Sequence, residues 1–115
     1  MNKEEILAME AGIELDKLIA TKVMGWQGKL DYSVFLFDSK VYHKYRFSTS
    51  ILAAWQVVEK LETDGYGHKH LKYSQNRDEE YSWIFMQPGY GIFEATGKTI
   101  QEAICKAALL TKETL

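Results

Sequence analysis

One amphipathic stretch, from Phe47 to Leu61, constrains the fold of this chain more than any other part of the sequence. Ser48 is placed to cap a helix, because a serine hydroxyl accepts a hydrogen bond from a free N–H group of the first turn. Phe47 and Leu52, on either side of this cap, have the spacing of a hydrophobic staple. The apolar residues that follow recur at helical spacing along one face: Ile51, Ala54, Trp55, Val58 and Leu61. We therefore expect a helix over about residues 49–63, at the centre of one core.

The chain has the composition of one globular domain, which is expected to span residues 1–115. Hydrophobic residues make up 46% and charged residues 26%, average values for folded domains that argue against disorder. A chain of this length buries enough apolar surface to stabilise its own core. We predict that this core contains the following residues: Trp26, Ile51, Trp55, Val58, Leu61, Trp83, Phe85 and Ile104.

The net charge, the apolar runs and the single cysteine limit the cellular locations and the classes of partner that we expect. The net charge of −2 lacks the basic excess that binds nucleic acid, so nucleic acid is not an expected partner. The apolar runs are far shorter than the roughly 20 residues that span a bilayer, and no apolar leader follows Met1. Cys105 has no partner for an internal disulfide, which fits a reducing cytosol. We expect a cytoplasmic protein that does not associate with membranes.

Two further helices are predicted near the ends of the sequence. The first covers about residues 3–24 and ends at Gly25. Its apolar positions cover more than the roughly 100° stripe of a helix that lies on one surface, which indicates burial between two layers or against another subunit. The last covers about residues 99–113 and begins with Thr99 and Glu102, the pattern of a capping box.

Alternating and continuous apolar runs predict five strands, at about residues 33–37, 41–45, 70–74, 81–87 and 90–95. Pro88 and Gly89 suit the centre of a tight turn between the last two. The order of elements is then α-β-β-α-β-β-β-α, which is typical of the α+β class. We expect three helices that cover both faces of a largely antiparallel or mixed sheet of four to five strands, an α-β-α sandwich.

Three segments carry motifs that occur together in one protein family. Leu-Asp and Val-Met-Gly-Trp lie within residues 9–26, Ser-Thr-Ser-Ile-Leu-Ala-Ala-Trp covers 48–55, and Ala-Ile-Cys-Lys-Ala-Ala-Leu covers 103–109. In combination they resemble the phage α-β-α (ABA) sandwich domain family, small proteins of phages and prophages of Gram-positive bacteria. This chain has Ser50 and Lys106 where the family has aspartate and arginine. The resemblance implies a fold and a phage origin but no established activity, so no catalytic residues carry over.

Residues 96–99, Thr-Gly-Lys-Thr, lie between the last strand and the last helix and resemble the tail of a phosphate-binding loop. The full motif requires a glycine at the position of Ile92, so a triphosphate-binding loop is not expected. Two interpretations remain open. Gly97, Lys98 and Thr99 can hold a single anion at the start of the helix, or they form an ordinary capped helix after a glycine turn.

The pair His68 and His70, with Asp64 nearby, has the side-chain types that bind a divalent metal. No fourth ligand is recognisable, and solvated loop histidines are the alternative, so neither a metal nor another cofactor is expected. Cys105 lies beside an alanine-rich helix face, where a free cysteine behaves as a small apolar residue. We therefore expect no catalytic cysteine.

These observations favour a non-enzymatic binding or interaction module that forms a homo-oligomer. Its expected partners are further copies of itself, with a small molecule or a host protein as additional candidates. An alternative is a phage counter-defence protein that sequesters a small nucleotide signal in a pocket between subunits. A third hypothesis is a metal-dependent enzyme that uses His68 and His70.

Overall fold

A computed structural model describes residues 2–26, 29–30, 35–37, 40–42, 46–73, 80–89 and 91–113 of the chain. Several predicted strand positions, namely 33–34, 43–45, 74 and 90, lie outside the described residues. Within the described part the chain forms helices and antiparallel strands, which confirms the α+β class.

The helical segments of the described part are α1 (Lys3–Ala8), α2 (Ile13–Leu18), the π-helical η1 (Ile19–Val23), α3 (Ile51–Thr63) and α4 (Ile100–Lys112). Helix α4 begins where predicted, because the Thr99 side chain accepts a hydrogen bond from the N–H of Glu102. Helix α3 lies within the predicted range of 49–63, and its cap is Ser50, whose hydroxyl accepts from the N–H of Ala53. The Ser48 hydroxyl, predicted as the cap, binds Asp16 instead.

The predicted helix over residues 3–24 is wrong as a single element, since the chain breaks between α1 and α2. Gly12 precedes α2 with φ 153° and ψ −168°, a conformation that residues with side chains rarely adopt. Its backbone N–H donates to Ser48 Oγ at 2.9 Å. The break thus depends on a contact between positions distant in sequence, which the local apolar pattern does not reveal.

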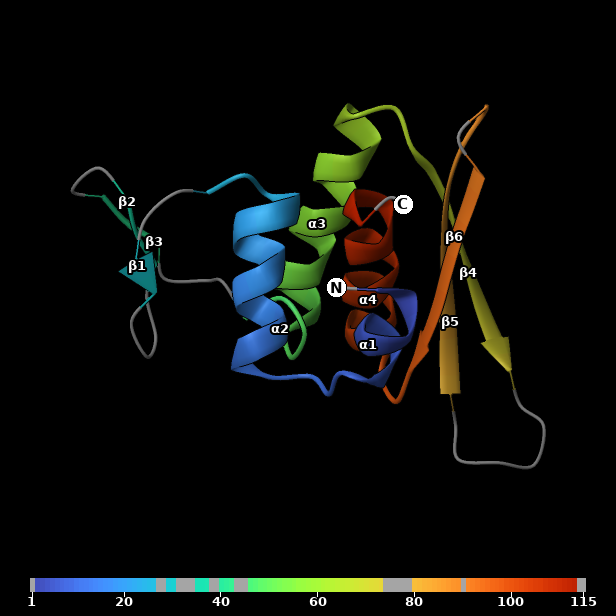
Figure 1. The fold of residues 1–115 in the computed structure, drawn as a ribbon, viewed down its shortest axis with the longest axis horizontal. Helices are drawn as coiled ribbons and strands as arrows, with labels where there is room; N and C mark the ends of the chain where they lie inside the picture. The colour runs from blue at the N-terminus through green and yellow to red at the C-terminus, as the bar shows by residue number, and fades with distance from the viewer. Residues whose placement is uncertain are drawn as a thin grey trace.

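The described strands form two separate antiparallel sheets. One contains β1 (Lys29–Leu30), β2 (Phe35–Phe37) and β3 (Lys40–Tyr42), and the other contains β4 (Gly67–Tyr73), β5 (Glu80–Gln87) and β6 (Gly91–Gly97). Figure 1 shows the helices standing between the two sheets. The prediction of one sheet of four to five strands is therefore wrong, because helices occupy the space that a continuous sheet would need.

The larger sheet has β5 as its central strand, with Trp83 opposite His70 on β4 and Ala95 on β6. Trp83 and Phe85 are buried, at 3% and 0% exposure, on the face that the helices cover. The described helices lie on this side of the sheet (Figure 1). On the other side, within the described residues, Ile92 remains 70% exposed.

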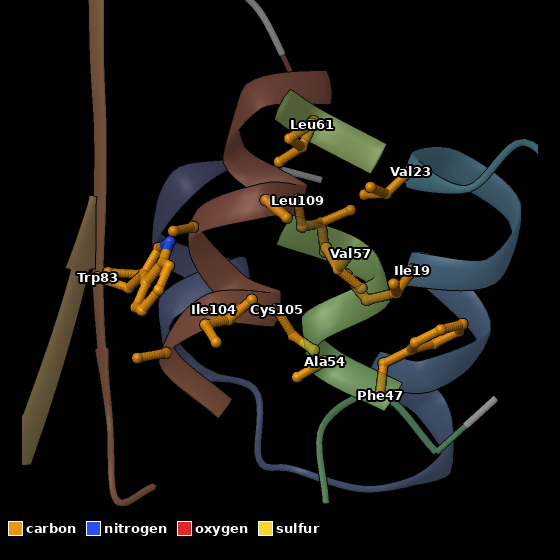
Figure 2. Close-up of a cluster of buried hydrophobic side chains, with 14 of the residues drawn as sticks. Ile19, Val23, Phe47, Ala54, Val57, Leu61, Trp83, Ile104, Cys105 and Leu109 are labelled. Atoms are coloured by element: carbon orange, nitrogen blue, oxygen red, sulfur yellow. The ribbon is translucent and has the colours of Figure 1, made fainter. Parts of the chain in front are cut away.

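Helix α4 lies at the centre of the molecule, and every residue from Glu102 to Thr111 is buried. Figure 2 shows Trp83 of the sheet against one side of α4, while Cys105 and Leu109 are directed toward α3. Small side chains of α4 let both neighbours approach closely: Ala103, Ala107 and Ala108. The central helix is thus α4 rather than the predicted helix over residues 49–63.

Most of the predicted core residues are buried at 3% exposure or less: Val58, Leu61, Trp83, Phe85 and Ile104. Trp26 is partly buried against this core. The prediction is wrong for Ile51 and Trp55, which are 47% and 45% exposed. The buried face of α3 keeps Ala54, Val58 and Leu61 of the predicted stripe, with Ala53 and Val57 in place of Ile51 and Trp55. Because α4 packs closely on this face, alanine and valine fit at positions 53 and 57, while Ile51 and Trp55 lie toward solvent.

Because one face of α3 is buried and the other is exposed, two truncations in this helix are expected to lower the free energy of unfolding by different amounts. Leu61→Ala removes a fully buried side chain and is expected to lower the free energy of unfolding by about 2–5 kcal/mol. Trp55→Ala removes a half-exposed ring and is expected to cost less, about 1–2 kcal/mol. Urea denaturation of both variants measures the difference. A larger loss for Trp55→Ala than for Leu61→Ala would show that the assignment of the buried face of α3 is wrong.

Candidate functional site

A cleft of about 390 Å³ lies where the first turns of α3 and α4 approach the linker between α1 and α2. The residues that line it come from these three parts of the chain: Glu10, Ala11, Ser48, Thr49, Lys98, Thr99, Gln101 and Glu102. Its volume is within the range of small-molecule sites, and its lining offers hydroxyl, amide and charged groups. Lys98 and Thr99, predicted as parts of an anion site, therefore reach a real depression in the surface.

Ser48, which lines the cleft, is hydrogen-bonded to the carboxylate of Asp16, and the two residues are 1% and 3% exposed. The backbone N–H and the hydroxyl of Ser48 both donate to Asp16 Oδ1, at 2.8 and 2.6 Å. Burial raises the pKa of Asp16, while the Ser48 hydrogen bonds and the charge of Arg46 act in the opposite direction. This network joins α2 to the turn that precedes α3.

A second buried polar group supports the start of α4. Glu102 Oε1 accepts a hydrogen bond from the backbone N–H of Lys98 at 2.7 Å, and its other oxygen lies 3.4 Å from Lys106 Nζ. Lys106 Nζ also donates to the carbonyl of Leu7 in α1 at 3.0 Å. Glu102 and Lys106 are 7% and 5% exposed, so the pair is sheltered from solvent. The pair ties α1 to the first turns of α4.

The position of Glu102 changes the interpretation of the predicted anion site at Gly97, Lys98 and Thr99. A carboxylate of the chain already occupies the positive end of α4, where an anion would otherwise bind. Gly97 serves close packing, because a Cβ atom there would lie 2.9 Å from the backbone nitrogen of Ala103. The groups that remain for a ligand are the exposed side chains of Lys98 and Thr99, with those of neighbouring lining residues.

The structure does not bring the predicted metal ligands together. The rings of His68 and His70 stack on Trp83, with centroids 5.3 and 5.9 Å away. The carboxylate of Asp64 pairs instead with Lys60 Nζ, at 3.1 Å. Within the described residues there is no group of three or more His, Cys, Asp or Glu side chains that could hold a metal ion.

Cys105 is fully buried in α4. Burial raises the pKa of its thiol well above the ordinary value, and the charges of Asp16 and Glu102 act in the same direction. A thiol held in its protonated form is a poor nucleophile. Its place in the packing matches the predicted role of a small apolar residue.

A second surface feature is a group of large apolar side chains on the outward face of α3, which we call the α3 ridge. It consists of Ile51, Leu52 and Trp55, at 47%, 72% and 45% exposure. The Trp55 ring meets the rings of His68 and Trp83 edge-on, with centroids 6.0 and 6.3 Å away. Apolar periodicity alone predicts Ile51 and Trp55 in the core and therefore does not reveal this surface.

The pKa of Asp16 leads to a test of the buried contact between Asp16 and Ser48. A carboxyl whose pKa is raised on folding contributes stability below its ordinary pKa of 3.8 and loses it as the pH rises through the raised value. Asp16→Asn is therefore expected to be at least as stable as the unmodified protein at pH 7, with an advantage that shrinks toward pH 4. Urea denaturation at both pH values measures this.

Asp16→Ala is the control for the hydrogen bonds. It removes the acceptor of both Ser48 bonds and is expected to cost about 1–3 kcal/mol at either pH. An advantage of Asp16→Asn that grows on acidification would contradict the dominant role of burial.

None of the helices in the described part of the chain is long and apolar enough to cross a membrane.

The comparisons with known proteins identify the family. No curated protein and no solved structure matches the chain. The family model of the phage ABA sandwich domain matches residues 17–109, which is most of the 115-residue chain. The chain therefore belongs to the phage ABA sandwich domain family.

Proposed function

We propose that this phage protein is a non-enzymatic binding module that works as a homo-oligomer in the host cytoplasm. The observation that supports the proposal is the α3 ridge. Contiguous large apolar side chains on a surface mark interaction sites in small soluble proteins. Covering a side chain such as Leu52, now 72% exposed, contributes about 1–2 kcal/mol per chain to association.

The chemistry of the described residues supports a role in binding rather than catalysis. The buried polar groups under the cleft are engaged with each other, as in the Asp16–Ser48 and Glu102–Lys106 contacts. Because these groups are buried and hydrogen-bonded to one another, their main contribution is to hold the shape of the surface. The thiol of Cys105 is buried among apolar side chains, where a substrate does not reach it.

For a homo-oligomer, light scattering at micromolar concentration is expected to give a mass above that of one 13.3 kDa chain. Leu52→Asp places a charge on the ridge and is expected to shift the protein to the single-chain mass. Ile92→Asp is the matched control, because Ile92 is 70% exposed on the larger sheet and should leave the mass unchanged. A single-chain mass for the unmodified protein would overturn the proposal.

An alternative function is counter-defence by sequestering a small nucleotide signal. The observation that favours it is the cleft, where Lys98 and Thr99 lie beside other hydroxyl and amide groups. An anionic ligand would bind through the Lys98 side chain, since Glu102 occupies the helix end.

A panel of cyclic and linear nucleotides tests this alternative by thermal denaturation. A ligand at 100 times its Kd adds about 2.7 kcal/mol to the stability of the folded state and raises the melting temperature. Lys98→Glu is expected to abolish the shift without changing the melting temperature of the free protein. Absence of a shift with every nucleotide would exclude this function.

A further inference from the structure

Two opposite charges line the cleft without pairing with each other. Glu10 belongs to the linker between α1 and α2, Lys98 directly follows β6, and both residues are exposed. Within the described residues, neither side chain makes an ion pair or a hydrogen bond. The cleft therefore has one carboxylate and one ammonium group that remain available to a ligand.

The third charge in the lining is already balanced inside the protein. The carboxylate of Glu102 lies 3.4 Å from Lys106 Nζ, and both residues are buried. A simple anion bound at Lys98 would leave Glu10 without a partner and would be repelled by its charge, and a simple cation bound at Glu10 would be repelled by Lys98. A ligand that carries both charge signs satisfies both side chains.

The uncharged part of the lining favours a small polar ligand. None of the described residues that line the cleft is aromatic, so it offers no ring on which a nucleobase could stack. The Thr99 hydroxyl accepts a hydrogen bond from the N–H of Glu102 at 3.2 Å, and its own hydrogen remains for an acceptor on a ligand. This donor follows Lys98 in the sequence, so the two residues together suit a carboxylate.

Hydrogen bonds fix the backbone on both sides of the cleft. The linker that contains Glu10 is held through Gly12, whose N–H donates to Ser48 Oγ at 2.9 Å. The backbone at Lys98 is held through its own N–H, which donates to Glu102 Oε1 at 2.7 Å. Both charged side chains thus extend from a frame that is in place before a ligand arrives, which lowers the cost of ordering on binding.

From these observations we propose that the cleft binds a small zwitterion, a molecule with one carboxylate and one ammonium group, as in a free amino acid. The ligand carboxylate pairs with Lys98 and accepts from the Thr99 hydroxyl, and the ligand ammonium group pairs with Glu10. The inference goes beyond the homo-oligomer and names a ligand class different from the nucleotide of the alternative function.

A titration with four zwitterions tests the ligand class. Glycine, β-alanine, γ-aminobutyrate and diglycine carry the two charges at different separations, so the tightest binder reports the spacing of Glu10 and Lys98. At least one is expected to shift the backbone amide NMR signals of Lys98 and Thr99 at up to about 10 mM, a concentration that detects a Kd of about 1 mM. No shift with any of the four would overturn the proposal.

Two analogues that each lack one charge are the matched ligand controls. N-acetylglycine has no ammonium group and glycinamide has no carboxylate. Each is expected to bind at least about tenfold more weakly than the best zwitterion, because each leaves one charged side chain of the cleft unpaired. Binding of N-acetylglycine as tight as that of the best zwitterion would reduce the cleft to a simple anion site and reject the inference.

Charge reversal tests the two side chains. Glu10→Lys and Lys98→Glu, each alone, leave two like charges in the cleft and are expected to raise the Kd of the best zwitterion at least about tenfold. The double variant has one charge of each sign again, and a zwitterion can bind it in the reverse direction. Its Kd is expected to return to within about fivefold of the unmodified value.

Glu59→Lys on α3 and Lys69→Glu on β4 are the matched controls, because both residues are exposed and neither lines the cleft. They should leave the Kd unchanged, and circular dichroism checks that every variant is folded. A folded double variant that binds no more tightly than the single variants would contradict the pairing of both charges.

The outcomes separate this inference from the proposed functions. A nucleotide that raises the melting temperature while no zwitterion binds would reject the zwitterion site and leave the alternative function in place. A single-chain mass in light scattering would overturn the homo-oligomer without affecting the binding of zwitterions, because no residue of the α3 ridge lines the cleft.

Discussion

The close packing of α4 between the larger sheet and α3 is the constraint on which the rest of the structure depends. Every residue from Glu102 to Thr111 is buried, so α4 has no free side and its side chains set the spacing of both neighbours. The alanines of α4 allow a short distance between the two helices, and α3 has small buried residues on the facing side, Ala53, Ala54 and Val57. A tryptophan does not fit in that space, and Trp55 therefore lies half exposed beside β4. The outward apolar surface of α3 is thus a consequence of the tight inner one.

Buried polar contacts hold the remaining helices to this centre. Asp16 binds the turn before α3 through Ser48, and Lys106 binds the carbonyl of Leu7 at the other side of α4. Buried charges of this kind cost desolvation energy and add stability only when each is well paired. They do specify one arrangement of α1, α2 and α4, because a shifted packing would leave a carboxylate or an ammonium group without a partner. The cleft lies beside these contacts, because Ser48 and Glu102 also line it.

The parts of the fold that local chemistry controls could be predicted from the sequence. Thr99 and Glu102 placed the start of α4 correctly, and the alternation around Trp83 placed β5, because caps and strand faces depend on neighbours within a few residues. Lys98 and Thr99 line a cleft, but the hydrogen bond of Glu102 at the start of α4 is visible only in the tertiary structure. The break at Gly12 could not be predicted, because it rests on a hydrogen bond to Ser48.

The sequence by itself determined the class of fold, the family and the approximate extents of α3 and α4, since periodicity and capping are local properties. Only the tertiary structure decided which side of α3 is buried, how the strands divide into two sheets and which polar groups meet under the cleft. The physical reason is that the predicted stripe and the buried one share Ala54, Val58 and Leu61 and have the same helical period. The choice between them depends on how closely the neighbouring element can approach, and here α4 approaches closely enough to favour the side with Ala53 and Val57 over the side with Ile51 and Trp55.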